Sequence, residues 1–320
     1  MHELFSTPDL SDFPQSMHLA MIKDATRMEA FTKAITQTVS KGDTVLDVGS
    51  GTGILSILAA RAGAKKVYSI EKSSIAEYTK QVVKDNGLDD VVEVLHHDIF
   101  SSELPNIRAD VVISEFLGTF GIGENVLRIL NHVRENYTTP DTRMIPENVS
   151  LWMAPIQCLN DYRAISDWNR KILNIDFGAI QDLAYNAVYH LPTNNTVLLS
   201  NPCMMKSFEF SGNVPPEFTE QLQFQIGIDG VLHGVAGWFS SRLSDGVEIE
   251  NSPESTPTHW GQVMFPTGQP ALVRPGDSVN FKFAEIENPG ARIWSWEGHL
   301  YDCSSETNVH HFRYRAERAR

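Results

Sequence analysis

The stretch Val45-Leu46-Asp47-Val48-Gly49-Ser50-Gly51-Thr52-Gly53-Ile54-Leu55 decides the fold class of this chain. A short apolar run enters a loop with three glycines, and a helical pattern follows the loop. Glycines let the backbone approach a ligand closely, and the N–H groups at the start of a helix point toward it. The order of strand, glycine loop and helix predicts the first unit of a doubly wound α/β sheet with a ligand at its loop.

The segments around this stretch extend the same pattern. Strand-like and helical runs alternate, which indicates βαβ units around a parallel sheet. Upstream, apolar residues recur at three- and four-residue steps from Met17 to Val39 and predict one amphipathic helix. The alternating runs are the strands Thr44–Val48, Val67–Glu71, Val91–Leu95 and Val111–Ser114 and the helices Gly53–Ala62 and Ile75–Asn86.

The chain changes character near Pro146, where the helical alternation stops and β-patterning begins. Residues 222–228 and 231–239 flank Asp229-Gly230, a pattern typical of a tight hairpin. Residues 160–182 interrupt the β-pattern as a helical excursion whose Ile165, Trp168 and Ile172 are too apolar for solvent and indicate a protein contact. Further strands are expected at Ser150–Ile156, Ser207–Phe210, Val279–Phe283 and Trp294–Tyr301.

Composition limits the classes of function. The formal charge of −14 argues against a nucleic-acid binder and suits a cationic partner. The polar start and the lack of long apolar runs predict neither a signal peptide nor a membrane span. The scattered cysteines Cys158, Cys203 and Cys303 show no metal-ligand spacing, so no metal site is expected, and they indicate a reducing compartment. We therefore expect a cytoplasmic protein, with the nucleus also open to a eukaryotic chain.

Acidic residues beside the glycine loop indicate which cofactor it binds. A dinucleotide loop would have a glycine at the position of Ile54, and Asp47 would repel its diphosphate. S-adenosylmethionine carries an ammonium and a sulfonium instead, so Asp47 favours it over a nucleotide or a purely structural turn. Glu71 ends the second strand, where a carboxylate can accept from both ribose hydroxyls. Asp98 is either an acceptor for the adenine amino group or a solvated loop acid.

Two glutamates indicate the methyl acceptor. Glu115 and Glu124 flank an apolar, glycine-rich loop that begins at the carboxyl end of the fourth strand, where α/β sheets bind ligands. Two carboxylates in a dry pocket repel unless a cation lies between them, and a guanidinium fork suits both. Holding its charge toward one nitrogen would leave another richer in electrons, which is catalysis by orientation and electrostatics. The alternative is that Glu115 caps a helix and Glu124 is a surface residue.

A third group of residues lies far apart in the sequence. Asp24 and Arg27 are one turn apart on the N-terminal helix, and Pro257-Thr258-His259-Trp260 forms a polar-aromatic motif. A lone histidine is usually structural or solvated. Paired with Asp24, however, His259 could join the two halves and relay the proton lost after methyl transfer. Arg27 could bind the carboxylate of the cofactor.

These motifs resemble the protein arginine methyltransferase family over nearly the whole chain. The resemblance implies cofactor contacts from His18, Arg27, Asp47, Gly49, Gly51, Gly53 and Glu71, a catalytic set of Glu115, Glu124, Asp24 and His259, and a substrate pocket bordered by Met21 and Trp260. The acid that the family places near the adenine is displaced here, with Phe100 in its expected neighbourhood, so Asp98 is a cofactor candidate only by its place after a strand. It implies S-adenosyl-L-methionine as cofactor and S-adenosyl-L-homocysteine as product. It also implies a Rossmann-like cofactor domain at 41–147 closed by an N-terminal region at 1–40. A β-barrel at 148–320 would follow, with a dimerisation arm at about 160–182.

The sequence also departs from the family. Thr7–Pro14 lacks the tyrosines of members that dimethylate asymmetrically, so we expect monomethylarginine as the main product. Three functions stay open: methylation of arginine in proteins or peptides, methylation of free arginine or another small guanidino compound, and a non-catalytic scaffold. The expected assembly is a homodimer without nucleic acid or membrane.

Overall fold

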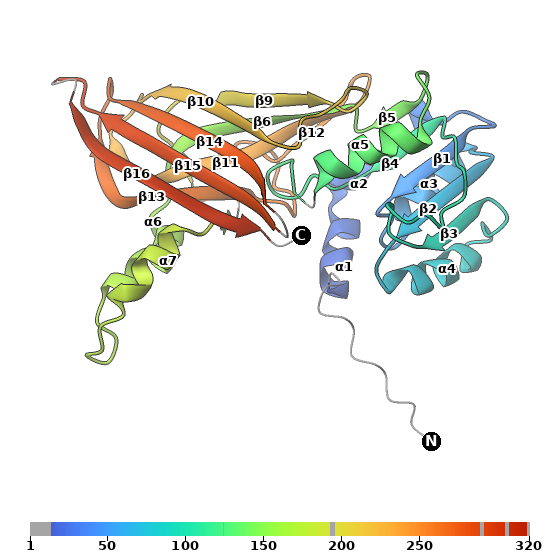
Figure 1. Ribbon diagram of the computed structural model, residues 1–320, viewed down its shortest axis with the longest axis horizontal. Coiled ribbons are helices and arrows are strands. Elements are labelled where there is room, and N and C mark those ends of the chain that lie inside the picture. The colour runs from blue at the N-terminus through green and yellow to red at the C-terminus, as the bar shows by residue number, and fades with distance from the viewer. Residues whose placement is uncertain (1–13, 124, 193–195, 289–290, 305–306, 319–320) are drawn as a thin grey trace.

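The computed structural model describes residues 14–318 except 124, 193–195, 289–290 and 305–306. It contains one parallel sheet with helices and two antiparallel sheets. The parallel sheet lies at one end of the molecule in Figure 1, and both antiparallel sheets lie at the other end. Glu124 and nearly all of the stretch without tyrosines lie outside the described residues.

The parallel sheet has the strand order β3-β2-β1-β4-β5, and all neighbouring strands run parallel. This confirms the doubly wound fold. The order reverses between β1 and β4, and ligands of such sheets bind at that point, beyond the carboxyl ends of the strands. The elements are β1 (Thr44–Val48), α3 (Ile54–Ala62), β2 (Lys66–Glu71), α4 (Ile75–Asp85), β3 (Val92–His96), β4 (Val111–Ser114), α5 (Val126–Tyr137) and β5 (Arg143–Ile145).

The N-terminal region is not one helix, and that prediction is wrong. It divides into α1 (Gln15–Lys23) and α2 (Ala25–Thr38), with Asp24 extended between them at φ −69° and ψ 96°. The break occurs because the Asp24 side chain accepts from the backbone N–H of Arg27 at 3.0 Å and caps α2. Helix α2 buries Phe31 and Ile35 in the core, whereas α1 buries no residue. The two helices therefore differ in burial despite their common periodicity.

The second half forms two antiparallel sheets of order β10-β14-β15-β16 and β7-β13-β11-β6-β8, with β12 paired to β11 and β9 to β6. Contacts of β9 with β10 and of β13 with β16 join the sheets, and aromatic rings such as Phe265 and Trp294 pack between them. The expected barrel-type domain is confirmed. Its strands are β6 (Asn148–Gln157), β7 (Tyr189–Leu191), β8 (Val197–Leu198), β9 (Cys203–Glu209), β10 (Phe218–Gln225), β11 (Gly230–Ser244), β12 (Val247–Glu250), β13 (Gln262–Val273), β14 (Ser278–Asn288), β15 (Ala291–Tyr301) and β16 (Asn308–Arg318).

The hairpin expected at Asp229-Gly230 is wrong. Strand β10 pairs with β14, and β11 pairs with β6, β12 and β13 in the other sheet. The chain leaves the first sheet at Ile226, whose N–H donates to the Asp277 carbonyl, and Gly227 N–H then donates to Leu199. The turn residues therefore lie in a crossing between sheets, which local alternation cannot distinguish from a hairpin.

The excursion is an arm of short helices that projects from the sheets in Figure 1: α6 (Leu159–Ser166), η1 (Asp167–Asn169), η2 (Gly178–Ile180) and α7 (Gln181–Tyr185). Ile165 was expected on its contact surface, but it is fully buried because it packs beside Tyr162 in a core cluster. Other apolar residues of the arm are exposed, among them Leu173 at 89% and Leu183 at 72%. Across the described residues, every helix is too short or too polar to span a membrane.

The loop after β4 reaches from the parallel sheet into the barrel-type domain. Phe120 is 1% exposed, and its ring packs edge-on against Phe265 and Trp294. A Cβ at Gly121 would lie 2.8 Å from Val149 and 2.9 Å from Leu151 and Phe239. The backbone of this loop thus fits against β6 and β11 without space for a side chain, which fixes the loop on the second domain.

We expect Gly121→Ala to destabilise the fold. Both Gly121 and Gly246 have positive φ, but Gly246 has open space around it. Gly246→Ala therefore isolates the conformational penalty of about 1–2 kcal/mol. Gly121→Ala should add about 1–3 kcal/mol from overpacking, measured by denaturant unfolding. Equal losses in the two variants would contradict the close packing of this loop.

Candidate active site

The glycine loop lies at the switch point between β1 and β4. Gly49, Gly51 and Gly53 have φ values of 69°, 52° and 78°, which favour glycine. A Cβ at Gly49 would lie 2.3 Å from the Phe116 ring, and one at Gly51 would lie 3.3 Å from His18. The loop is therefore bordered by the α1 helix on one side and by the segment after β4 on the other.

Asp47 lies beneath this loop at the end of β1 with 1% of its surface exposed. Its Oδ2 accepts from Ser56 Oγ of α3 at 2.5 Å. Burial raises the pKa of Asp47 to about 7, although the hydrogen bond from Ser56 opposes the shift. A cation nearby would favour the charged form of this carboxylate, which suits a ligand with an ammonium group.

Glu71 faces the loop from the end of β2. Its Oε2 accepts from Gly51 N–H at 2.8 Å, and its Oε1 accepts from Ser73 N–H at 2.8 Å. The side chain is 8% exposed. Each carboxylate oxygen has a second lone pair, so the orientation that the backbone fixes still permits bonds to a pair of hydroxyls.

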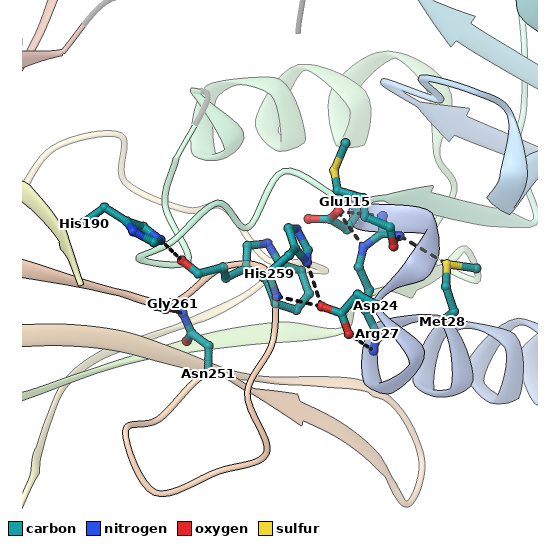
Figure 2. Close-up of polar contacts among 10 residues, drawn as sticks. Asp24, Arg27, Met28, Glu115, His190, Asn251, His259 and Gly261 are labelled. Carbon is teal, nitrogen blue, oxygen red and sulfur yellow. Dashed lines mark hydrogen bonds and ion pairs between the residues drawn. The ribbon is translucent and has the colours of Figure 1, made fainter. Parts of the chain in front are cut away.

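Arg27 and Glu115 form a buried ion pair between α2 and the loop after β4 (Figure 2). Arg27 Nη2 and Nε donate to Glu115 Oε2 at 2.7 and 3.0 Å, and the two side chains are 6% and 8% exposed. Glu115 Oε1 accepts only a longer bond of 3.3 Å from Leu117 N–H among the described residues. One oxygen of Glu115 is thus committed to Arg27, and the other has capacity for a further donor.

Asp24 connects the N-terminal helices to the second domain (Figure 2). Its Oδ1 caps α2, while its Oδ2 accepts from the backbone N–H of His259 at 2.9 Å and lies 2.8 Å from His259 Nδ1. Burial would raise the pKa of Asp24, but hydrogen bonds from Arg27 and His259 together lower it. The predicted Asp24–His259 pair is therefore present, 235 residues apart in the sequence.

Three other predicted site residues have no side-chain hydrogen bond to Arg27, Glu115, Asp24 or His259 among the described residues. The Met21 carbonyl accepts from Arg27 Nη1 at 3.3 Å. Trp260 is 4% exposed and packs edge-on against Phe239, so its side chain contributes to the core. Asp98 is exposed and accepts from Phe100 N–H at 3.0 Å. The roles of Met21 and Trp260 in a substrate pocket and of Asp98 at the adenine stay predictions.

Several residues at the site carry no signal in the sequence. Phe116 borders Gly49, and Thr79 donates to the Gly51 carbonyl at 2.6 Å while its methyl group blocks a Cβ at Gly53. Ser50 Oγ is buried in the loop, and the described residues offer it no hydrogen-bond partner. An unsatisfied buried hydroxyl in a ligand loop is a feature that a bound polar group would explain. The spacing of Phe116 next to Glu115 is the one clue that sequence reasoning could have used.

Comparison with known families first gives the class of protein. Residues 26–139 match the model described as Ribosomal protein L11 methyltransferase (PrmA), and residues 147–292 match the Arginine methyltransferase oligomerization subdomain. The parallel sheet with its acidic glycine loop is therefore that of a methyltransferase.

The chain belongs to the protein arginine methyltransferase family. It is 32% identical to Probable protein arginine N-methyltransferase 6 of Arabidopsis thaliana, covering 78% of this chain and 67% of that protein. It is 30% identical to Protein arginine N-methyltransferase PRMT10 of the same plant, covering 81% and 77%. A solved structure of the Trypanosoma brucei PRMT1 enzyme-prozyme heterotetrameric complex with AdoHcy has a TM-score of 0.84 at 25% identity, covering 95% of this chain and 98% of that chain.

We expect Asp24→Ser to retain the helix cap but lose the anchor on His259, and Asp24→Ala to lose both. The first change should lower the free energy of unfolding by about 1.5–3 kcal/mol, the value for hydrogen bonds to a charged group. The second should lower it by about 1 kcal/mol more. Chemical denaturation measures both, and equal stability of Asp24→Ser and the unsubstituted chain would contradict the anchor.

The pH dependence of this difference has a defined sign. Because the folded protein lowers the pKa of Asp24, its stabilising effect is present above the ordinary value of 3.8. The effect is lost as the pH falls through the lower folded value. The stability difference between the unsubstituted chain and Asp24→Ser should therefore shrink in acid.

Proposed function

We propose that this chain transfers the methyl group of S-adenosylmethionine to a guanidino nitrogen of arginine in proteins or peptides. The observation that carries the proposal is the buried Glu115 carboxylate at the switch point, which already binds one guanidinium, that of Arg27. A carboxylate that binds one guanidinium through Oε2 retains lone pairs on Oε1 that can orient a second. Family membership supports the same reaction.

The glycine loop and the residues around it have the chemistry to bind the cofactor. Glu71 would accept from the ribose hydroxyls, Asp47 would attract the ammonium group, and the backbone at Gly49, Gly51 and Gly53 would allow close approach. Arg27 of α2 would bind the carboxylate of the cofactor, and His18 borders Gly51. When bound, the cofactor supplies an electrophilic methyl group.

The residues of the chain then orient the acceptor and take up a proton. Glu115 and, by prediction, Glu124 would form a clamp of two carboxylates on the guanidinium. The clamp would hold the guanidinium charge toward one nitrogen and leave another richer in electrons. A nitrogen–carbon bond forms, and one N–H proton must leave. Asp24 binds His259 Nδ1 and thereby leaves Nε2 as the ring nitrogen for proton exchange.

Consecutive segments of the chain would carry different functions. We assign closure of the cofactor site to residues 1–40, cofactor binding to 41–147, and substrate and subunit contacts to 148–320. The arm would dock on a second copy of the chain through the exposed apolar residues around Leu173 and Leu183.

Mass spectrometry after incubation with cofactor tests the proposed reaction. An arginine-rich peptide should gain 14 Da per methyl group, and a matched peptide with lysine at every arginine position should not. Free arginine, as the competing substrate, decides between protein and small-molecule methylation. Monomethylarginine should dominate at early and late times. Methylation of the lysine peptide alone would refute the proposal.

Glu71→Ala should weaken the binding of S-adenosylhomocysteine by about 1.5–3 kcal/mol, because a charge-assisted pair of acceptors is lost. Isothermal titration calorimetry measures the affinity. Glu93→Ala is the matched control, since Glu93 lies on the neighbouring strand β3 but is half-exposed and pairs with Lys66. Equal affinities of the two variants would remove Glu71 from the cofactor site.

Glu115→Gln and Glu124→Gln should each lower kcat on an arginine peptide about 10²- to 10³-fold, the effect of removing one preorganised electrostatic group. Glu115→Gln should also destabilise the fold, because Arg27 would lose its buried partner. Initial rates with labelled cofactor and unfolding curves separate the two effects. Turnover near that of the exposed control Glu103→Gln would contradict the clamp.

The unsubstituted chain should be a dimer in light scattering at micromolar concentration. Leu173→Glu with Leu183→Glu should yield monomers of reduced activity, because charges replace exposed apolar contacts on the arm. Leu272→Glu is the matched control, since Leu272 is 85% exposed outside the arm. A monomeric unsubstituted chain, or a dimeric arm variant, would contradict docking through the arm.

A further inference from the structure

Asn251 is a buried polar residue between the two loops of the site. It follows β12, is 1% exposed, and lies beside Gly261 in Figure 2. Its Oδ1 accepts from Phe239 N–H of β11 at 2.8 Å, and its own N–H donates to the Phe239 carbonyl at 3.2 Å. Gln262 Nε2 donates to its carbonyl at 2.7 Å. Asn251 is therefore attached to β11 and to the start of β13 in the second domain.

The Asn251 amide nitrogen bridges two loops of different domains. Nδ2 donates to the Thr119 carbonyl at 2.8 Å and also to the Gly261 carbonyl. Thr119 lies in the loop between Glu115 and Glu124, and Gly261 lies two residues after His259. The same group thus binds the backbone that carries the clamp and the backbone that carries the Asp24 partner.

The residue type suits this task. An NH₂ group offers two donors and the adjacent oxygen an acceptor, so one side chain satisfies two carbonyls and one N–H. A hydroxyl has one donor, and a carboxylate has none. The Gly261 carbonyl is itself held in place, because Gly261 has φ +54° and a Cβ there would lie 2.5 Å from the Leu191 carbonyl oxygen. His190 Nε2 lies 3.0 Å from the preceding carbonyl, that of Trp260.

We propose that Asn251 is a positioning residue that sets the glutamate loop in register with the Asp24–His259 pair. This inference rests on the proposed function of the site. Among the described residues, the hydrogen bonds of Asn251 go to Phe239, Thr119, Gly261 and Gln262, and none goes to the glycine loop. Loss of the bridge therefore changes the rate of methyl transfer and leaves cofactor binding unaffected.

Asn251→Asp tests the bridge, because it retains the shape and the acceptor but removes both donors. We expect kcat on an arginine peptide to fall about ten- to a hundredfold, as for small misplacements of catalytic groups. The dissociation constant of S-adenosylhomocysteine should stay within about twofold, because no charge-assisted bond to the cofactor is lost. The new carboxyl faces two carbonyls in a buried place, so its pKa is raised and its protonated form donates one bond. The deficit in kcat should therefore shrink as the pH is lowered.

Asn148→Asp is the matched control. Asn148 is also buried, its Oδ1 accepts from Arg242 N–H at 2.9 Å, and its Nδ2 donates to Glu209, away from the site. This variant should lose stability but retain kcat per folded molecule and its pH profile. Asn251→Ser, which retains one donor, should have an intermediate kcat and serves if Asn251→Asp does not fold.

The outcomes separate the two claims. If the unsubstituted chain methylates arginine and the Asn251 variants retain its kcat, the positioning role is overturned and the proposed function stands. An equal loss of kcat in the Asn148 and Asn251 variants also overturns it, since a general loss of stability would explain both. Inactivity of the unsubstituted chain on every guanidino substrate overturns the proposed function itself.

Discussion

The buried ion pair between Arg27 and Glu115 is the interaction on which the rest of the site depends. Two charges with less than a tenth of their surface exposed are stable only when they are paired and hydrogen-bonded. Removing either partner would leave an uncompensated charge, at a cost of about 3–5 kcal/mol. Helix α2 and the loop after β4 must therefore keep their relative position, and this requirement determines where the remaining groups lie.

The surrounding bonds extend this constraint to the second domain. Asp24 holds the start of α2 to His259, Phe120 inserts the glutamate loop among the barrel aromatics, and Asn251 binds that loop and the His259 loop together. The site is thus assembled from three distant parts of the chain. Its rigidity explains how a single carboxylate oxygen can remain oriented toward a further donor, because each neighbouring group is already fixed by its own partner.

Local patterns predicted what local physics determines. The strands Thr44–Val48 and Val111–Ser114 agree with the structure at both ends, because apolar runs between turn residues have few alternatives. The position of Glu71 was also predicted from the end of its strand, whereas the Asp24–His259 pair, 235 residues apart, was expected from the family resemblance. The predicted hairpin at Asp229-Gly230 was wrong because the chain passes there from one sheet to the other. The single N-terminal helix was wrong because the Asp24 side chain caps a second helix. Asn251 carries no periodic signal, and its role depends on carbonyls 132 and 10 positions away.

A crystal structure with S-adenosylhomocysteine and an arginine peptide would show directly whether the two glutamates hold the methyl acceptor. We expect the peptide guanidinium to lie within hydrogen-bond distance of Glu115 Oε1 and of the Glu124 carboxylate, with Arg27 still bound to Glu115 Oε2. His259 Nδ1 should remain on Asp24 in the same crystal. A guanidinium bound elsewhere, with neither glutamate in contact with it, would contradict the proposed role of the two glutamates.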